Sequence, residues 1–139
     1  LKRWQELWTI GKDSNFYREV NPIVRTKTPF EHGGSRNEEV VIGRLRLGRA
    51  LVNSELARMG LIESDVCIQC NDFAKETIEH FLLECPGRVA LQRRLKKKND
   101  RGQILSSIKE IFHGKTATRA IFRHISAKEP NLQVGWARY

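Results

Sequence analysis

The sequence predicts a small, mainly α-helical domain that is stapled by one zinc ion. Apolar residues recur at helical spacing along much of the chain, and helix-capping residues precede several of these stretches. All three cysteines lie close together with one histidine. The 139 residues suffice for one ordinary domain. We divide the chain into an N-terminal helix with a loop-rich linker (1–35), a zinc-binding helical core (36–98), and a C-terminal helical pair with a tail (99–139).

The N-terminal segment has one apolar stripe at positions i, i+3, i+4 and i+7. This stripe consists of Trp4, Leu7, Trp8 and Gly11. The spacing predicts a helix that ends at Gly11, with both tryptophans packed into the core. Stacking of the two rings on nucleic-acid bases is the alternative. Residues 13–35 show no helical period, and their prolines and glycines predict a loop with at most a short strand at 16–20.

A second helix is expected to begin at Ser35, because Ser35 and Glu38 have the spacing of a capping box. One apolar face then continues for over five turns through Val41, Leu45, Gly48, Val52, Leu56 and Met59. Gly60 follows where helices often end in a left-handed residue. A glycine inside a helix costs about 1 kcal/mol relative to alanine, so we expect another group to pack closely against Gly48.

The cysteines and one histidine form the pattern C-x2-C-x9-H-x4-C, made of Cys67, Cys70, His80 and Cys85. Three thiolates and one imidazole are the ligand set of a closed, tetrahedral structural zinc site. The cysteines could instead be ordinary buried residues, or the first two could form a redox pair. A disulfide framework is disfavoured, because the cysteine count is odd and no stretch reads as a signal peptide. Neither alternative accounts for the nearby histidine and third cysteine.

The residues around the motif predict helices that carry its second half. Thr77 is a good N-cap for a short helix, which would present His80 from its first turn and Cys85 at its end. Pro86 suits the first position of the next helix, expected to run to about Lys98.

The C-terminal part predicts two further helices. The first has a core stripe made of Ile104, Leu105, Ile108, Ile111 and Phe112, and ends at His113 and Gly114. Thr116 is the expected cap of the second helix, which carries a small basic patch at Arg119 and Arg123.

The charge of the chain indicates a polyanionic partner. There are 25 Lys and Arg residues against 16 Asp and Glu residues, which gives a net charge of +9. A surplus of this size favours nucleic acid, RNA or DNA, as the partner. The residues expected to contact phosphates are Arg44, Arg46, Arg49, Arg93, Arg94, Lys96, Lys97, Lys98 and Arg101. The alternative for each of these groups is a solvated helix face.

Catalytic motifs are not visible in the sequence. We find no glycine-rich phosphate loop, no G-x-S-x-G and no H-E-x-x-H. The segment is therefore expected to be non-enzymatic. No apolar run approaches the ~18–20 residues that span a bilayer, and reduced cysteines favour an intracellular protein of the nucleus or cytoplasm.

The ordered set Arg44-Leu45-Arg46-Leu47-Gly48, Cys67-x-x-Cys70, Glu76-Thr77-x-x-His80 and Cys85-Pro86 resembles a known module. It is similar to the zinc-binding segment at the C-terminal end of many non-LTR retrotransposon polyproteins, downstream of the reverse transcriptase and, where present, the ribonuclease H domain. The resemblance covers roughly residues 1–95. In one departure, Arg49 stands where the family often has a histidine.

The resemblance implies that Cys67, Cys70, His80 and Cys85 bind zinc. It also implies that the chain is part of a reverse-transcribing element, or of a host protein derived from one, and helps to hold template RNA or target DNA. The sequence thus predicts a non-catalytic, zinc-binding nucleic-acid-binding module. The alternative is a structural zinc module that braces a neighbouring polymerase or nuclease domain, or a partner protein.

Overall fold

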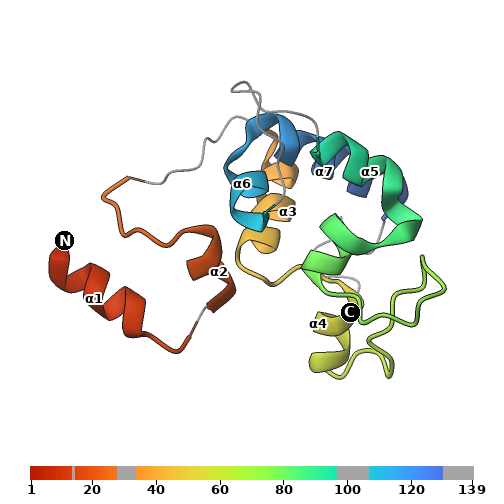
Figure 1. Ribbon diagram of the computed structural model, residues 1–139, viewed down its shortest axis with the longest axis horizontal. Helices are drawn as coiled ribbons and strands as arrows, with labels where there is room; N and C mark the ends of the chain where they lie inside the picture. The colour runs from red at the N-terminus through yellow and green to blue at the C-terminus, as the bar shows by residue number, and fades with distance from the viewer. Residues whose placement is uncertain (14, 28–33, 97–106, 130–139) are drawn as a thin grey trace.

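The protein is mainly helical, as the sequence predicts, in a computed structural model that describes residues 1–13, 15–27, 34–96 and 107–129 (Figure 1). Its α-helices are α1 (Lys2–Ile10), α2 (Asn15–Val20), α3 (Arg36–Arg46), α4 (Asn53–Arg58), α5 (Val89–Leu95), α6 (Ile108–His113) and α7 (Lys115–Lys128). A π-helical turn, His80–Glu84, and a 3-10 turn, Pro86–Arg88, precede α5. The described residues contain no strand, only an isolated antiparallel bridge between Val66 and Lys75.

Helix α7 lies at the centre of the packing. It contacts α3, α5 and α6, while α2 packs on α3 and α6 (Figure 1). The core joins residues from all three predicted segments, among them Val20, Leu45, Phe81, Phe112 and Ile121, each at most 1 % exposed. The division into three segments stays a prediction. No described helix is long and apolar enough to cross a membrane.

The prediction of a single long helix after Ser35 is wrong, because the chain turns at Gly48. Helix α3 ends at Arg46, Gly48 has φ +70°, and α4 begins only at Asn53. The expectation that a group packs closely against Gly48 is confirmed, since a Cβ there would lie 2.9 Å from Cγ of Phe16. A left-handed residue with an aromatic ring against it favours glycine, which ends the helix.

Both ends of that predicted stretch are confirmed. The Ser35 hydroxyl accepts a hydrogen bond from the Glu38 amide at 3.2 Å, which caps α3. Gly60 has φ +74° and follows α4 by one residue, Met59. The turn still places the apolar sides of α3 and α4 in one core. The helical spacing therefore predicted the buried residues, although two helices carry them instead of one.

The N-terminal part differs from its prediction in two respects. Residues 15–20 form helix α2, not a strand, and Val20 is fully buried. Helix α1 ends before Gly11 as predicted, but it buries no residue, and Trp4 is 70 % exposed. The indole of Trp8 donates instead to the Asn21 carbonyl at 3.1 Å. The prediction that Trp4 packs in the core is therefore wrong, because α1 lies against the segment after α2 and not on the core.

The C-terminal helices differ in their caps. Helix α6 ends at His113 as predicted, and an unpredicted capping box between Ser107 and Glu110 starts it. Helix α7 begins at Lys115 after Gly114, so Thr116 is not its cap. Ile104 and Leu105 lie outside the described residues.

Candidate metal centre

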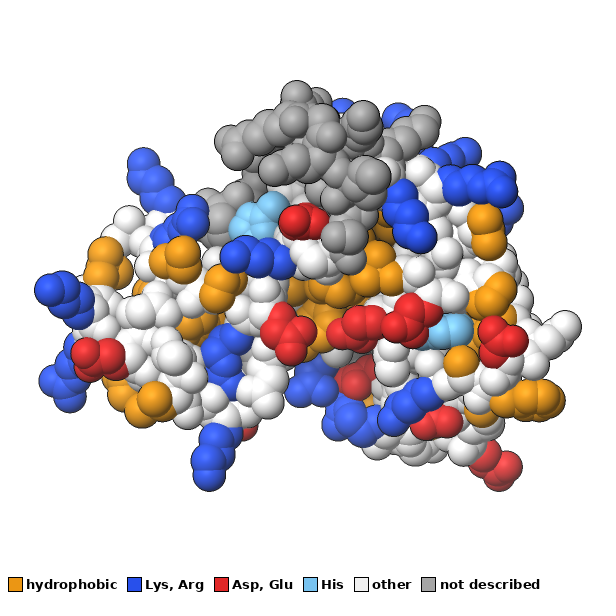
Figure 2. All heavy atoms as spheres, in the orientation of Figure 1, with side chains coloured by type: hydrophobic (Ala, Val, Ile, Leu, Met, Phe, Trp, Pro, Cys, Tyr) orange, Lys and Arg blue, Asp and Glu red, His pale blue; other side chains and the backbone are white. Residues whose placement is uncertain are grey.

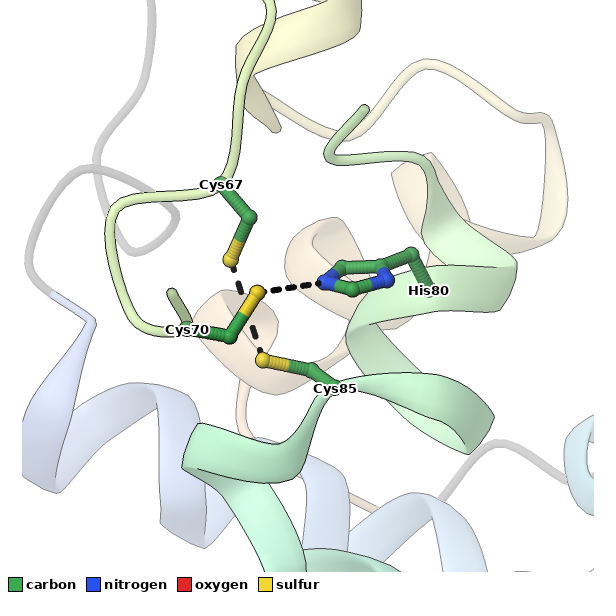
Figure 3. A group of neighbouring side chains, drawn as sticks. All are labelled: Cys67, Cys70, His80 and Cys85. Atoms are coloured by element: carbon green, nitrogen blue, oxygen red, sulfur yellow. Dashed lines mark hydrogen bonds between the residues drawn. The ribbon is translucent and has the colours of Figure 1, made fainter. Parts of the chain in front are cut away.

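The structure brings the four predicted ligands to one point. Cys67 and Cys70 lie in the loop after α4, and we call the segment Cys67–Cys70 the knuckle. His80 is the first residue of the π-helical turn, and Cys85 directly follows the turn. Their ligand atoms all lie within 4.8 Å of one another. Figure 3 shows the three sulfurs and the imidazole pointing toward a common centre.

The spacing of these atoms fits one tetrahedral metal ion. The sulfurs of Cys67 and Cys85 are 3.7 Å apart, and the Cys70 sulfur lies 3.5 Å from Nε2 of His80 (Figure 3). A tetrahedron with zinc–sulfur bonds of about 2.3 Å has edges of about 3.8 Å. All three cysteines are free, so no disulfide occupies the site. The group can hold one metal ion, and its donors are those that zinc prefers.

Backbone pairing holds the knuckle beside the rest of the loop. The Cys67 amide donates to the Ala74 carbonyl, and the Glu76 amide donates to the Asp65 carbonyl, both at 2.8 Å. These bonds flank the Val66–Lys75 bridge. The chain therefore reverses tightly around the two cysteines, which presents both sulfurs on one side.

The π-helical turn explains how His80 and Cys85 reach the same ion. In an α-helix, residues five apart differ by about 140° around the axis, so their side chains diverge. Here the Cys85 amide donates to the His80 carbonyl at 2.7 Å, an i→i+5 bond that places the two residues one above the other. The predicted cap is confirmed, because the Thr77 hydroxyl accepts from the His80 amide at 3.1 Å.

Arg88 is a central residue of the site that the sequence did not reveal. Its side chain is 3 % exposed, and Nη1 lies 3.4 Å from the Cys67 sulfur and 3.5 Å from the Cys85 sulfur. The guanidinium also lies over the Phe81 ring, 4.2 Å from its centroid. With a divalent ion bound by three thiolates and one neutral imidazole, the site would carry a net charge of −1. The guanidinium of Arg88 would then place a positive charge directly against it.

Two carboxylates hold Arg88 in this position. Glu76 Oε2 accepts from Nη2 at 3.1 Å, and Glu129 Oε1 accepts from Nε at 2.8 Å. Burial works against the charge of Arg88, but hydrogen bonding to Glu129 raises its pKa above the ordinary value. Burial likewise opposes ionisation of Glu129, but the His124 imidazole 3.6 Å away and the hydrogen bond from Arg88 lower its pKa. The network joins the metal site to Glu129 at the end of α7.

Burial raises the pKa of the Cys67 thiol to about 11, although a backbone hydrogen bond at Gln69 and the Arg88 side chain favour the thiolate. Without metal, this sulfur therefore keeps its proton at neutral pH. Metal binding would displace that proton, as is general for thiolate ligands.

The predicted phosphate-contacting residues fall into separate groups. Arg93, Arg94 and Lys96 lie exposed on α5 and at its C-terminal end. Within the described part of the chain, none of the three has a carboxylate within 4 Å. Lys97, Lys98 and Arg101 lie outside the described residues.

The arginines of α3 and the following turn make contacts within the protein. Arg46 is half-buried and donates to the Phe112 carbonyl at 2.9 Å. Arg49 lies 3.2 Å from Glu55, which also pairs with Arg58 at 2.7 Å. The hydrogen bond from Arg58 lowers the pKa of Glu55. Arg44 is half-buried.

Helix α7 packs against both α3 and α5, so the two arginine groups stand on different helices that both contact α7. Arg119 and Arg123 of α7 are exposed. Lys and Arg side chains gather over the α5 end of the molecule, at the upper right of Figure 2.

The signals for the unpredicted residues are weak in the sequence. Glu76 occurs in the motif that carries the resemblance, but Arg88 is one of many arginines, and its partner Glu129 is 41 residues away.

In comparisons of sequence and fold, no family model, curated protein or solved structure matches this chain.

Proposed function

We propose that this chain is a zinc-binding module that contacts nucleic acid through a basic surface and is not itself catalytic. The observation that carries the proposal is the path of α5. This helix begins at the metal centre and ends in exposed basic residues that have no acidic partner in the described part of the chain.

The metal centre would fix the direction of α5. Gln92 donates its side-chain amide to the Cys85 carbonyl at 2.6 Å, and Arg88 contacts two of the ligand sulfurs. Leu91 and Leu95, each 1 % exposed, fix the opposite face in the core. Arg93 and Arg94 are thereby held outward at fixed positions. Zinc would supply the rigid anchor and perform no chemistry on a substrate.

The proposed contact surface consists of Arg93, Arg94 and Lys96 with Arg119 and Arg123 of α7. Helix α7 packs directly on α5, so both basic groups belong to neighbouring helices. Arginine and lysine contacts to phosphates position a strand but carry little sequence information. The proposed binding is therefore non-specific or led by shape. It weakens as the salt concentration rises, because the release of condensed counterions from the nucleic acid then becomes less favourable.

Reversing the charge of this surface is expected to weaken binding by at least about tenfold. The variant R93E/R94E removes two phosphate contacts and adds repulsion, while its exposed positions leave the core unchanged. The measurement is fluorescence anisotropy of labelled RNA and DNA oligonucleotides at 50 and 200 mM salt. The wild-type affinity is expected to be lower at 200 mM than at 50 mM by at least about tenfold.

The matched control is K12E/R36E, which makes the same change in net charge at exposed positions outside the proposed contact surface. Equal losses in both variants would reduce the effect to net charge alone. Affinity that does not respond to salt, or no binding at 50 mM, would refute the proposal.

The origin that the motif resemblance implies is part of the same proposal. We infer a segment of a non-LTR retrotransposon polyprotein, or of a host protein derived from one. The buried Cys67/Cys70/His80/Cys85 group supports it at the level of the ligand set. The proposal expects a reverse transcriptase or ribonuclease H signature in the same reading frame.

A structural role is the second candidate, favoured by the exposed apolar residues of α1. Trp4, Leu7 and Ile10 are 70 %, 57 % and 74 % exposed. In that case the module would brace a neighbouring polymerase or nuclease domain, or a partner protein, through α1. R93E/R94E would then leave function intact, while substitutions of Trp4 or Trp8 would impair it.

A further inference from the structure

A pocket of about 420 Å³ lies between α1 and the segment after α2. This volume is within the range of about 300–1,000 Å³ that is usual for ligand pockets. Its lining includes three aromatic rings, an amide and a guanidinium, from Trp4, Trp8, Tyr17, Asn21 and Arg25. It lies at the opposite end of the chain from the basic surface on α5 and α7, and the proposed phosphate contacts do not use it.

The pocket has one fixed aromatic wall and one open one. Trp8 is held by its bond to the Asn21 carbonyl, by Tyr17 packed edge-on with ring centroids 5.9 Å apart, and by the Arg18 guanidinium 5.7 Å from its ring. Trp4 is 70 % exposed, and within the described part of the chain no ring or guanidinium stacks on it. A flat, exposed indole beside a rigid aromatic wall can accept another flat ring.

The charges around the pocket are suited to a phosphate backbone. Among the described residues that line the pocket, Arg25 is the charged one and none carries a carboxylate. Lys2 and Arg3 directly precede Trp4 and are exposed. A stacked base would therefore bring its neighbouring phosphates toward cationic side chains.

We propose that this pocket binds an unpaired base of single-stranded nucleic acid, stacked on Trp4. The inference rests on the proposed nucleic-acid function and adds a preference for single strands. Bases in a duplex are already stacked and paired, so they cannot enter without unpairing. An aliphatic peptide would fill the same apolar volume, but it would not use the cations, and aromatic rings combined with cations are typical of single-strand binding.

Trp4→Ala tests the stacking contact. Helix α1 buries no residue and alanine is the best helix former, so the variant is expected to fold. We expect affinity for oligo-U and oligo-dT to fall by about tenfold, and duplex affinity to stay within about twofold. Trp4→Phe retains a ring and is expected to restore most of the affinity. Ile10→Ala, exposed on the same helix and outside the pocket, is the control.

Fluorescence provides an independent readout. Oligo-U or oligo-dT is expected to quench the tryptophan emission of the wild type but to quench that of Trp4→Phe much less. The control is Trp136→Phe, which removes a tryptophan outside the described residues and is expected to be quenched like the wild type. The RNA and DNA arms show which strand the pocket prefers.

The outcomes separate this inference from the function on which it rests. If R93E/R94E weakens binding while Trp4→Ala and Ile10→Ala bind single strands equally well, the pocket does not bind bases and the basic surface stands. Equal losses of single-strand and duplex binding in Trp4→Ala would also overturn the inference. If the wild type binds no nucleic acid, both proposals fail.

Discussion

Arg88→Ala is expected to reduce the free energy of unfolding by about 3–5 kcal/mol, the usual cost of removing one partner from a buried charge network. Glu76 and Glu129 would lose the cation between them in a setting where they are 8 % and 15 % exposed. The sulfurs of Cys67 and Cys85 would lose their neighbouring positive charge. Metal affinity is therefore expected to fall as well, by about 10–100-fold.

Urea unfolding with metal present measures the first effect, and competition with a chromophoric chelator measures the second. Arg94→Ala is the matched control on the same helix, and its exposed side chain should change stability by no more than about 0.5 kcal/mol. Arg88→Lys keeps the charge but cannot reach all the acceptors, so it should lie between the two. An Arg88→Ala protein as stable as Arg94→Ala would show that the network contributes nothing.

Gly87→Ala is expected to displace the knuckle and to weaken metal binding by at least about tenfold. A Cβ at this position would collide with the backbone of Gln69, lying 2.8 Å from its carbonyl carbon and closer still to its oxygen. Gln69 sits between the first two ligands, and its backbone cannot move without moving Cys67 or Cys70. Such overpacking costs about 1–3 kcal/mol in a well-packed interior.

Gly43→Ala is the matched control, because a Cβ there has no atom within 4 Å and the position lies inside α3. That variant should be more stable than the wild type by about 0.5–1 kcal/mol, with unchanged metal affinity. Both affinities come from the same chelator competition. Wild-type metal binding by Gly87→Ala would mean that the knuckle does not rest on Gly87.

The ligands of the site could be predicted because their spacing is local. Two cysteines three positions apart form one half of a metal site, and Thr77 sets the start of the turn that carries His80. The π-helical turn that aligns His80 with Cys85 has no such local signature. It is stabilised by the packing of Phe81 and Leu82, both fully buried.

The break at Gly48 shows what a helical period reports. Leu45 and Leu56 are both buried on the same core, although a turn separates their helices. The period therefore predicted which residues are buried but not whether one helix carries them. The deciding contact is with Phe16, which is distant in the sequence.

Arg88 and Trp4 show the same limit in opposite directions. A single sequence gives arginine an exposed position by default, but Arg88 is buried because Glu76 and Glu129 meet it from distant segments. From the sequence, two tryptophans on one helix face are expected to pack in the core, but no element packs over Trp4 in the described part of the chain. Burial of these residues depends on tertiary partners, which local pattern does not contain.

We propose that Cys67, Cys70, His80 and Cys85, whose ligand atoms lie within 4.8 Å of one another, bind one zinc ion that holds the fold together. The most direct measurement is metal analysis of the protein purified in reducing buffer, with X-ray absorption to identify the ligands and circular dichroism before and after a chelator. We predict one zinc per chain with three sulfur ligands and one nitrogen ligand, and loss of much of the helical signal when the metal is removed. A folded protein that contains no metal and takes up none when titrated with zinc would contradict the account.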